Sequence, residues 1–299
     1  MHWRFYFLIC PISLFGWCEP TIHEQNLIIF ENVYKFFKEV CIFKDLSIRI
    51  PLGKILLLGS NGSGKTTFFK LCCGLQKVQS GQIKVIGFDN SNDLEAVKKN
   101  ISYAQSEPSF QNSLTSADLY DYLATYASTN RIEELETCFN AEKLRTMNFG
   151  KMSSGEKQTI NLIFSLSRDC PLYLLDEPLH FLDVTKRLRL IAFLMKLQKN
   201  IIIASHEVNE LMCVTDYVAT LNYQGPKNGS KLALSKIDAN KRFLIGLQDV
   251  SAALNKLKKA KFSANFVEPL IEIDAAYLLD LIDTIGSEHL LFLRRNIDV

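Results

Sequence analysis

A glycine-rich loop at residues 59–66 constrains the fold of this chain more than any other segment. It lies between an apolar strand predicted over 55–58 and a helix predicted over 66–73, and it reads Gly59-Ser60-Asn61-Gly62-Ser63-Gly64-Lys65-Thr66. Glycines let successive backbone N–H groups converge on anionic oxygens, and the following helix presents its positive dipole end to the same point. The order of strand, loop, Lys-Thr pair and helix predicts a nucleoside triphosphate site.

The end of this loop carries the residues expected to contact the triphosphate and its metal ion. Lys65 is expected to reach the β and γ phosphates, and Thr67 is also expected at the nucleotide. The Thr66 hydroxyl is expected to bind Mg²⁺, a hard cation that prefers oxygen ligands. The alternative is a glycine-rich turn that precedes a helix and binds nothing. We set it aside because all the required parts occur in the required order.

Composition and charge narrow the class of protein. The chain has 299 residues, of which 47% are hydrophobic and 22% charged, which suits one large domain plus a smaller one. A net charge of +2 without a dense Lys/Arg block argues against a nucleic-acid partner. The eight cysteines include no C-x-x-C pair and no zinc-like spacing, so reduced thiols are expected. Together with the nucleotide site, this predicts a cytosolic main domain.

Residues 1–25 form an N-terminal extension that differs from the rest. Residues 5–15 resemble the apolar core of a signal peptide, but Pro11 interrupts them and they are shorter than the ~20 apolar residues that span a bilayer. Trp17 is bulky where a cleavage site takes small residues. We interpret the extension as the product of a mis-chosen translation start. A segment that touches a membrane or a partner is the alternative.

Buried strands alternate with amphipathic helices from residue 26 to residue 224. Two or three strands are expected over 27–50, and further strands are predicted at 55–58, 82–86, 101–104, 172–175, 201–204 and 217–221. Helices are predicted at 66–73, 93–100, 116–127, 131–139, 154–168, 184–198 and 208–214. Such alternation predicts an α/β fold in which helices cover both faces of a parallel sheet.

The remaining residues are predicted to form a linker and a second domain. The linker is placed at 225–241 because it begins with turn residues. In the small domain at 242–299, strands are expected at 243–247, 262–267, 270–273 and 290–293, and helices at 250–259 and 275–285. This βαββαβ order is that of a split-βαβ domain.

Two acidic residues follow the predicted strand at 172–175. Asp176 is expected to bind Mg²⁺, directly or through water, and Glu177 is expected to polarise an attacking water as a general base. The alternative is a strand end that is merely solvated by two acids. The phosphate loop upstream favours the catalytic interpretation.

With these motifs, residues 27–221 resemble the ATP-binding cassette (ABC) family. The resemblance implies a P-loop NTPase cassette with a mixed-sheet core, an antiparallel β subdomain and a helical subdomain at about 106–168, here followed by a small α+β C-terminal domain. Ser153 and Gly155 lie in a segment that is similar to the family's signature loop, Met152-Ser153-Ser154-Gly155-Glu156-Lys157-Gln158. ATP and Mg²⁺ are the implied cofactors.

Four further positions match family motifs in the expected order. Gln105 matches the glutamine loop, which contacts Mg²⁺ and the attacking water, and His206 matches the switch histidine at the γ-phosphate. Asp183 matches the aspartate loop that couples two sites, and Phe37, or Phe36, is placed like the aromatic residue that stacks on adenine. Taken singly, each has a plain structural alternative. Their shared order favours the functional interpretation.

The resemblance also implies partners. Two cassettes, identical or different, would clamp ATP between the phosphate loop of one and the signature loop of the other, and a separate transmembrane permease subunit would be driven by the cycle. Three departures from the family pattern predict slow turnover: Ser154 in place of glycine, Glu156 in place of glutamine, and the bulky segment 180–183. The chain looks most like exporter ATPase subunits. The alternative is a soluble regulatory ATPase whose tail senses a ligand or dimerises.

Overall fold

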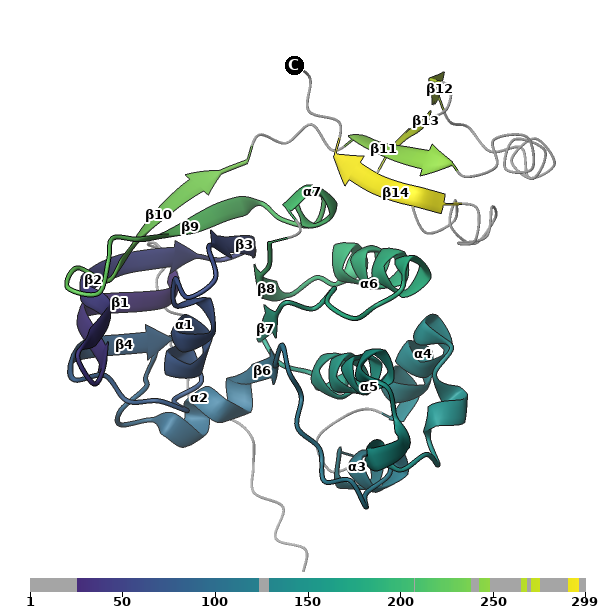
Figure 1. Ribbon diagram of the computed structural model, residues 1–299, viewed down its shortest axis with the longest axis horizontal. Coiled ribbons are helices and arrows are strands. Elements are labelled where there is room, and N and C mark those ends of the chain that lie inside the picture. The colour runs from purple at the N-terminus through teal and green to yellow at the C-terminus, as the bar shows by residue number, and fades with distance from the viewer. Residues whose placement is uncertain are drawn as a thin grey trace, which may run out of the picture.

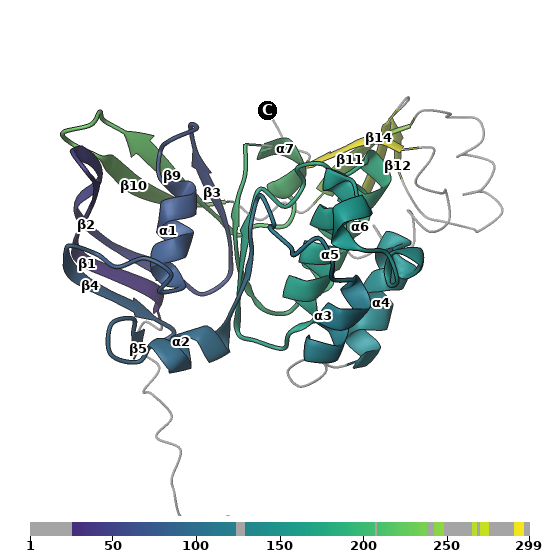
Figure 2. The ribbon, with the colours of Figure 1, turned by 60° about the horizontal axis from the view of Figure 1, so that its bottom comes forward.

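The structure is a computed structural model, which describes residues 26–123, 129–206, 208–237, 242–247, 265–267, 270–274 and 290–295. The described strands form an antiparallel sheet, a six-stranded mixed sheet and a small third sheet. Figures 1 and 2 show the antiparallel sheet on one side of helix α1 and the helical region on the far side of the mixed sheet. The expected fold class is therefore confirmed for these residues.

The antiparallel sheet has the strand order β2-β1-β4-β5. Its strands are β1 Asn26–Phe37, β2 Val40–Pro51, β4 Ser80–Val85 and β5 Phe88–Asp89. The segment for which two or three strands were expected forms two long ones, because the chain reverses once, at Lys38, where φ is +53°. Their alternating apolar side chains, such as Phe30 and Val33, pack inward toward α1.

The mixed sheet has the order β10-β9-β3-β8-β7-β6 and carries the site at one edge of its parallel strands. Its strands are β3 Lys54–Gly59, β6 Ile101–Ala104, β7 Leu172–Asp176, β8 Asn200–Ala204, β9 Tyr217–Tyr223 and β10 Ser230–Lys236. All pairs are parallel except β9 with β10. β3, β7 and β8 read as continuous apolar runs, as strands buried on both faces do.

The prediction of a linker at 225–241 is wrong for most of the residues that the structure describes in this range. Residues 225–229 form the turn of a hairpin, and β10 continues the sheet beside β9. Turn residues are as common in hairpins as at domain boundaries. In β10, half-buried Leu232 and Leu234 alternate with exposed residues, which is the pattern of a strand with one buried face. The hydroxyl of buried Ser230 donates a 2.6 Å hydrogen bond to the Ser63 carbonyl, so this hairpin also supports the phosphate loop.

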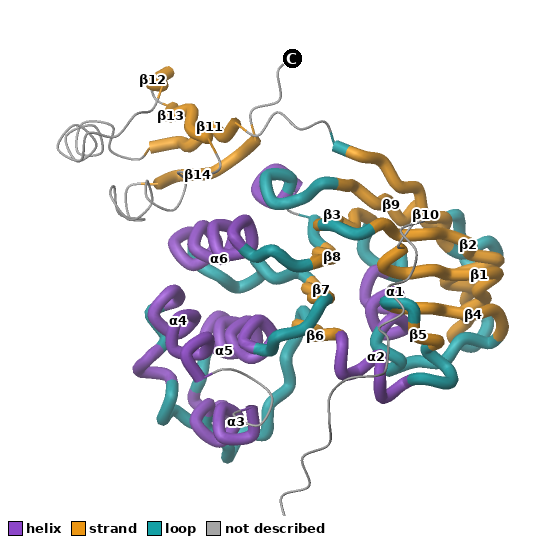
Figure 3. Tube along the Cα trace, turned by 180° about the vertical axis from the view of Figure 1, so that it is seen from behind, coloured by secondary structure: helices purple, strands orange, loops and turns teal. Residues whose placement is uncertain are grey.

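Helices surround the mixed sheet. They are α1 Lys65–Cys72, α2 Leu94–Asn100, α3 Ser116–Leu123, α4 Thr129–Phe139, α5 Ser154–Ser167, α6 Val184–Lys196 and α7 Val208–Leu211, with 3-10 turns at Glu142–Leu144 and Phe149–Lys151. Tube and ribbon views show α3, α4 and α5 grouped together, away from the antiparallel sheet (Figure 3). One apolar core lies beneath this group and α6, and a second lies around α1.

A third sheet lies near the C-terminus, in the order β12-β13-β11-β14. Its strands are β11 Arg242–Leu247, β12 Asn265–Val267, β13 Leu270–Asp274 and β14 Leu290–Arg295. They lie where four strands were predicted, and β14 runs beside α6 and α7 (Figure 1). The helices predicted at 250–259 and 275–285, like the extension at 1–25, fall outside the described residues.

Two further properties of the described residues concern helix length and the cysteines. Within the ranges given above, the structure has no helix whose length and apolar character would let it cross a membrane. The six cysteines of the described part are all free thiols, and five of them are buried.

Candidate nucleotide site

The phosphate loop connects β3 to α1 and depends on glycine at two positions. Gly62 has φ +81° and Gly64 has φ +101°, in the left-handed region that residues with a Cβ rarely adopt. A Cβ on Gly64 would also lie 2.8 Å from the Ile42 side chain. Gly64 caps α1, and its carbonyl accepts a 2.7 Å hydrogen bond from Phe68 N–H. The first N–H groups of α1 therefore point toward the loop, where an anion would gain their dipoles.

Lys65 is the first residue of α1, and its almost fully buried side chain lies against the loop. Its Nζ donates to the Gly59 carbonyl at 2.7 Å and lies 4.0 Å from the Glu177 carboxylate. The ammonium is thus held against the loop backbone with one acid nearby. This is where a lysine must lie to reach phosphate oxygens cradled by the same loop.

Thr66 and Asp176 bring two oxygen ligands together from α1 and the end of β7. The Thr66 hydroxyl donates a 2.7 Å hydrogen bond to Asp176 Oδ2, and Tyr103 from β6 donates to the same oxygen at 3.4 Å. Asp176 is 1% exposed, so burial, together with the Glu177 charge, raises the pKa of its carboxyl. A buried carboxylate beside a hydroxyl is an oxygen donor set that suits Mg²⁺, which takes few protein ligands.

Glu177 and His206 form a close pair just after the ends of β7 and β8. Glu177 has φ +50°, an unusual conformation for glutamate, and its N–H donates to the Ala204 carbonyl of β8 at 2.8 Å. His206 Nδ1 lies 3.0 Å from Glu177 Oε2. The two carboxylates thus have different close neighbours: Glu177 lies beside the histidine, and Asp176 beside the Thr66 hydroxyl.

Lys65, Thr66, Asp176 and Glu177 border one cavity of about 440 Å³, whereas Tyr103 and His206 are not among the residues that line it. Its walls are formed by Phe37, Ile42, Ser60, Asn61, Gly62, Gly64, Lys65, Thr66, Thr67, Ser106, Asp176 and Glu177. Most of the predicted nucleotide residues therefore lie around a common space. Ile42 and Ser106 were not proposed from the sequence, since one is an ordinary strand residue and the other a loop serine. Tyr103 also escaped prediction, and its position on the strand beside β7 was the available signal.

Other predicted residues lie away from this cavity. Gln105 is exposed next to the cavity residue Ser106, and its backbone carbonyl accepts a 2.8 Å hydrogen bond from Asn161 of α5. Ser153, Gly155 and Asp183 stand at the starts of α5 and α6 and do not line the cavity of their own chain. Gly59, Ser63 and His206 are also not among the residues that line the cavity. The structure thus places one group of predicted residues at or beside the cavity and a second group, Ser153, Gly155 and Asp183, at the starts of α5 and α6.

The start of α5 is fixed by a reciprocal cap. Ser153 Oγ accepts from Glu156 N–H at 3.3 Å, while Glu156 Oε2 accepts from Ser153 N–H at 2.8 Å and from Ser153 Oγ–H at 2.9 Å. The Ser153 hydrogen bonds lower the pKa of Glu156. A Cβ on Gly155 would lie 2.6 Å from the Phe181 carbonyl, so the first turn of α5 needs glycine where it packs on residues 177–181.

Comparisons with known proteins agree with this geometry. Residues 43–180 match the family model described as ABC transporter. The zinc import ATP-binding protein ZnuC of Rickettsia bellii is 31% identical over 204 residues, 67% of this chain and 84% of that protein. The bacitracin transport ATP-binding protein BcrA of Enterococcus faecalis is 26% identical, covering 64% of this chain and 65% of the relative.

A solved structure shows the same fold. The dimeric cassette MJ0796, a bacterial ABC transporter cassette, superimposes with a TM-score of 0.62 over 71% of this chain and 99% of its own, at 18% identity.

Proposed function

Because this chain belongs to the ABC transporter family, in which it is an ATP-binding subunit and an ATPase, we propose that it powers export of a substrate through a separate transmembrane permease subunit. In this proposal it lies on the cytoplasmic face of the membrane and pairs with a second cassette, identical or different. The named relatives include both an import protein and a bacitracin transport protein, so export rests on the sequence resemblance.

The observation that carries the proposal is the single cavity bordered by Lys65, Thr66, Asp176 and Glu177. Lys65 and the loop N–H groups would bind the triphosphate. Thr66 and Asp176 would hold Mg²⁺, with Gln105 beside it, and the ion would neutralise negative charge on the phosphate oxygens. Glu177 would accept a proton from the attacking water.

His206 and the residues at the starts of α5 and α6 complete the proposed site. His206, whose Nδ1 lies 3.0 Å from Glu177 Oε2, would orient that carboxylate and contact the γ-phosphate. Ser153, Gly155 and Asp183 lie outside the cavity of their own chain, so we propose that they act on the nucleotide of the partner cassette. The capped α5 N-terminus would then present its N–H groups to that γ-phosphate. Loss of the phosphate would open the dimer.

Nucleotide binding is tested first. Lys65→Ala should raise the Kd for ATP by at least tenfold, because it removes the cation held against the loop backbone. Lys70→Ala, at the other end of the same helix, is the matched control and should bind ATP like the unchanged protein. Equal affinity of the two variants would contradict the proposed role of Lys65.

Transport is tested with the protein in its native membrane. Detergent extraction and affinity purification, followed by mass spectrometry, should identify a chain with several apolar spans of ~20 residues bound to this one. Inside-out vesicles that contain both chains should accumulate the substrate when ATP is added outside. Uptake only into right-side-out vesicles would refute export, and purification without any membrane chain would favour the soluble regulatory alternative.

A further inference from the structure

A buried lysine lies directly behind Phe37, the aromatic residue at the mouth of the cavity. Phe37 ends β1 and is 42% exposed, whereas Lys35, two residues earlier, is only 6% exposed. The Lys35 Nζ lies 4.7 Å from the centroid of the Phe37 ring, and Lys35 does not border the cavity. The Phe37 ring thus contacts the buried cation, and Phe37 also borders the cavity.

The same ammonium is anchored to a second segment of the chain. Lys35 Nζ donates a 2.8 Å hydrogen bond to the Lys77 carbonyl. Gln79 adds three further hydrogen bonds to the end of β1: its N–H donates to Tyr34 O at 3.0 Å, and its side-chain amide pairs with the N–H and carbonyl of Phe36 at 3.1 and 3.0 Å.

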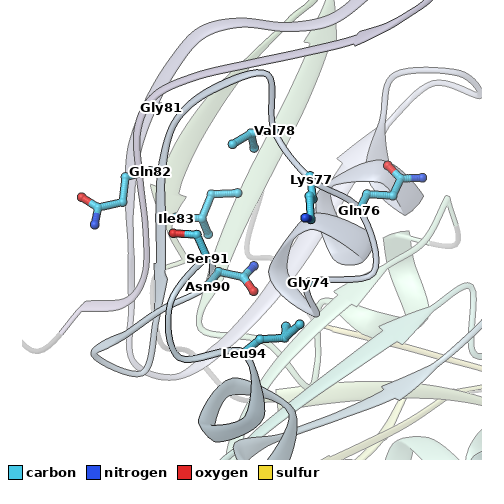
Figure 4. Close-up of a pocket in the computed structure, with 10 residues that line it drawn as sticks. All are labelled: Gly74, Gln76, Lys77, Val78, Gly81, Gln82, Ile83, Asn90, Ser91 and Leu94. Atoms are coloured by element: carbon cyan, nitrogen blue, oxygen red, sulfur yellow. The ribbon is translucent and has the colours of Figure 1, made fainter.

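Residues 77–79 therefore hold the strand end that carries Phe37. They follow α1, which begins at the phosphate loop, so one continuous stretch of chain connects that loop to the strand end that carries Phe37. Figure 4 shows Lys77 and Val78 among the residues that border a second cavity, of about 300 Å³.

Burial of a lysine here has a cost that an apolar residue would avoid. Burial lowers the pKa of Lys35 because the charged form loses hydration. Among the described residues, the ammonium is compensated by a carbonyl and an aromatic ring. A cation near a ring is attracted to its electron-rich face and restricts how the ring can turn. Such a fixed ring loses less entropy when a flat ligand stacks on it.

We infer that Lys35 is a positioning residue for the nucleotide base: it holds the Phe37 ring in the orientation that receives the base. The inference rests on the proposed function, in which Phe37 stacks on adenine. Lys35 acts through Phe37 and does not touch the nucleotide. Its effect is therefore confined to ligands that carry a base, and ligands that carry only phosphates should be insensitive to it.

The test compares ATP with inorganic tripolyphosphate by calorimetry on the full chain. Lys35→Met keeps the alkyl stem and should raise the Kd for ATP about 3- to 5-fold, in keeping with a partly buried cation–π contact. The Kd for tripolyphosphate should not change. Lys35→Arg should restore ATP affinity, and Lys38→Met, in the exposed turn after β1, should leave both affinities unchanged. Equal weakening of both ligands in Lys35→Met would overturn the inference.

A double-mutant comparison separates this inference from the proposed function. Phe37→Leu should weaken ATP binding alone, and adding Lys35→Met to it should cause no further loss. If Phe37→Leu leaves the Kd for ATP unchanged, Phe37 is not the base platform, and both statements fail. If Phe37→Leu weakens ATP binding but Lys35→Met weakens it equally with and without Phe37, only the role of Lys35 is refuted. Should Lys35→Met fold poorly, Lys35→Gln replaces it in the same comparison.

Discussion

Asp176→Asn should stabilise the protein in the absence of nucleotide and Mg²⁺ at pH 7. Burial, together with the neighbouring Glu177 charge, raises the pKa of this 1% exposed carboxyl. Each pKa unit gained on folding corresponds to ~1.4 kcal/mol of folding free energy lost at neutral pH. Asparagine can still accept the hydrogen bond from Thr66. We therefore expect a gain on the order of 1 kcal/mol, which raises the Tm by roughly 2–4 °C.

The pH dependence of this gain has a definite sign. A carboxyl whose pKa is raised in the folded state contributes stability below its unfolded pKa, near the usual value of 3.8, and loses it as pH rises through the folded pKa. The gain in stability from Asp176→Asn should therefore be small below pH 3.8. It should grow between the unfolded and the folded pKa of Asp176 and stay constant at higher pH. Asp118→Asn is the control with opposite sign, because Thr115 hydrogen bonds lower the pKa of exposed Asp118.

Ligand should reverse the order of stability. ATP with Mg²⁺ at 100 times its Kd adds ~2.7 kcal/mol to the unchanged protein, whereas the variant lacks a metal ligand and gains less. Calorimetric unfolding with and without ATP and Mg²⁺, from pH 3 to pH 8, measures both effects. If Asp176→Asn unfolds at a lower temperature than the unchanged protein at pH 7 without ligand, the hydrogen bonds from Thr66 and Tyr103 stabilise the carboxylate more than burial destabilises it. That result would refute the reasoning.

Four further substitutions test other parts of the structure. Glu177→Gln should slow phosphate release by about 10²- to 10⁴-fold while ATP still binds, and retention of full activity would exclude it as the base. Arg145→Met should lower the free energy of unfolding in urea by ~3–5 kcal/mol, because it leaves the Glu136 carboxylate, which is 3% exposed, without its charged partner. Glu136→Gln should lower it by only about 1 kcal/mol, because the Arg145 side chain is 42% exposed and reaches water. A reversed order would contradict this. Gly155→Ala should cost ~1–3 kcal/mol, because its Cβ would meet the Phe181 carbonyl, and unchanged stability would show that the loop yields freely.

Much of the fold follows from sequence patterns that act locally. Apolar runs such as 201–204 and the glycine loop define strand, turn and helix within a few residues, and the structure has these elements where the sequence predicts them. The linker was mispredicted because the pairing of β10 with β9 is decided by tertiary contacts. Turn residues at 225–229 alone do not reveal whether the chain leaves the sheet or returns to it.

In the candidate site, too, contiguous motifs could be predicted and contacts between distant segments could not. The phosphate loop and the Asp176-Glu177 pair are contiguous motifs, so their residues could be identified in advance. Contacts between distant segments could not. The Tyr103 hydrogen bond to Asp176 and the position of Lys35 between Phe37 and Lys77 depend on how strands from different parts of the chain lie together.

The hydrogen bond from Ser230 to Ser63 sets a limit on how this molecule can be shortened or rearranged. A chain truncated after residue 224 would keep all the cassette motifs, yet it would lose the hydrogen bond that supports its phosphate loop. Engineers who graft a new module onto this scaffold should therefore join it beyond Lys236, where β10 ends.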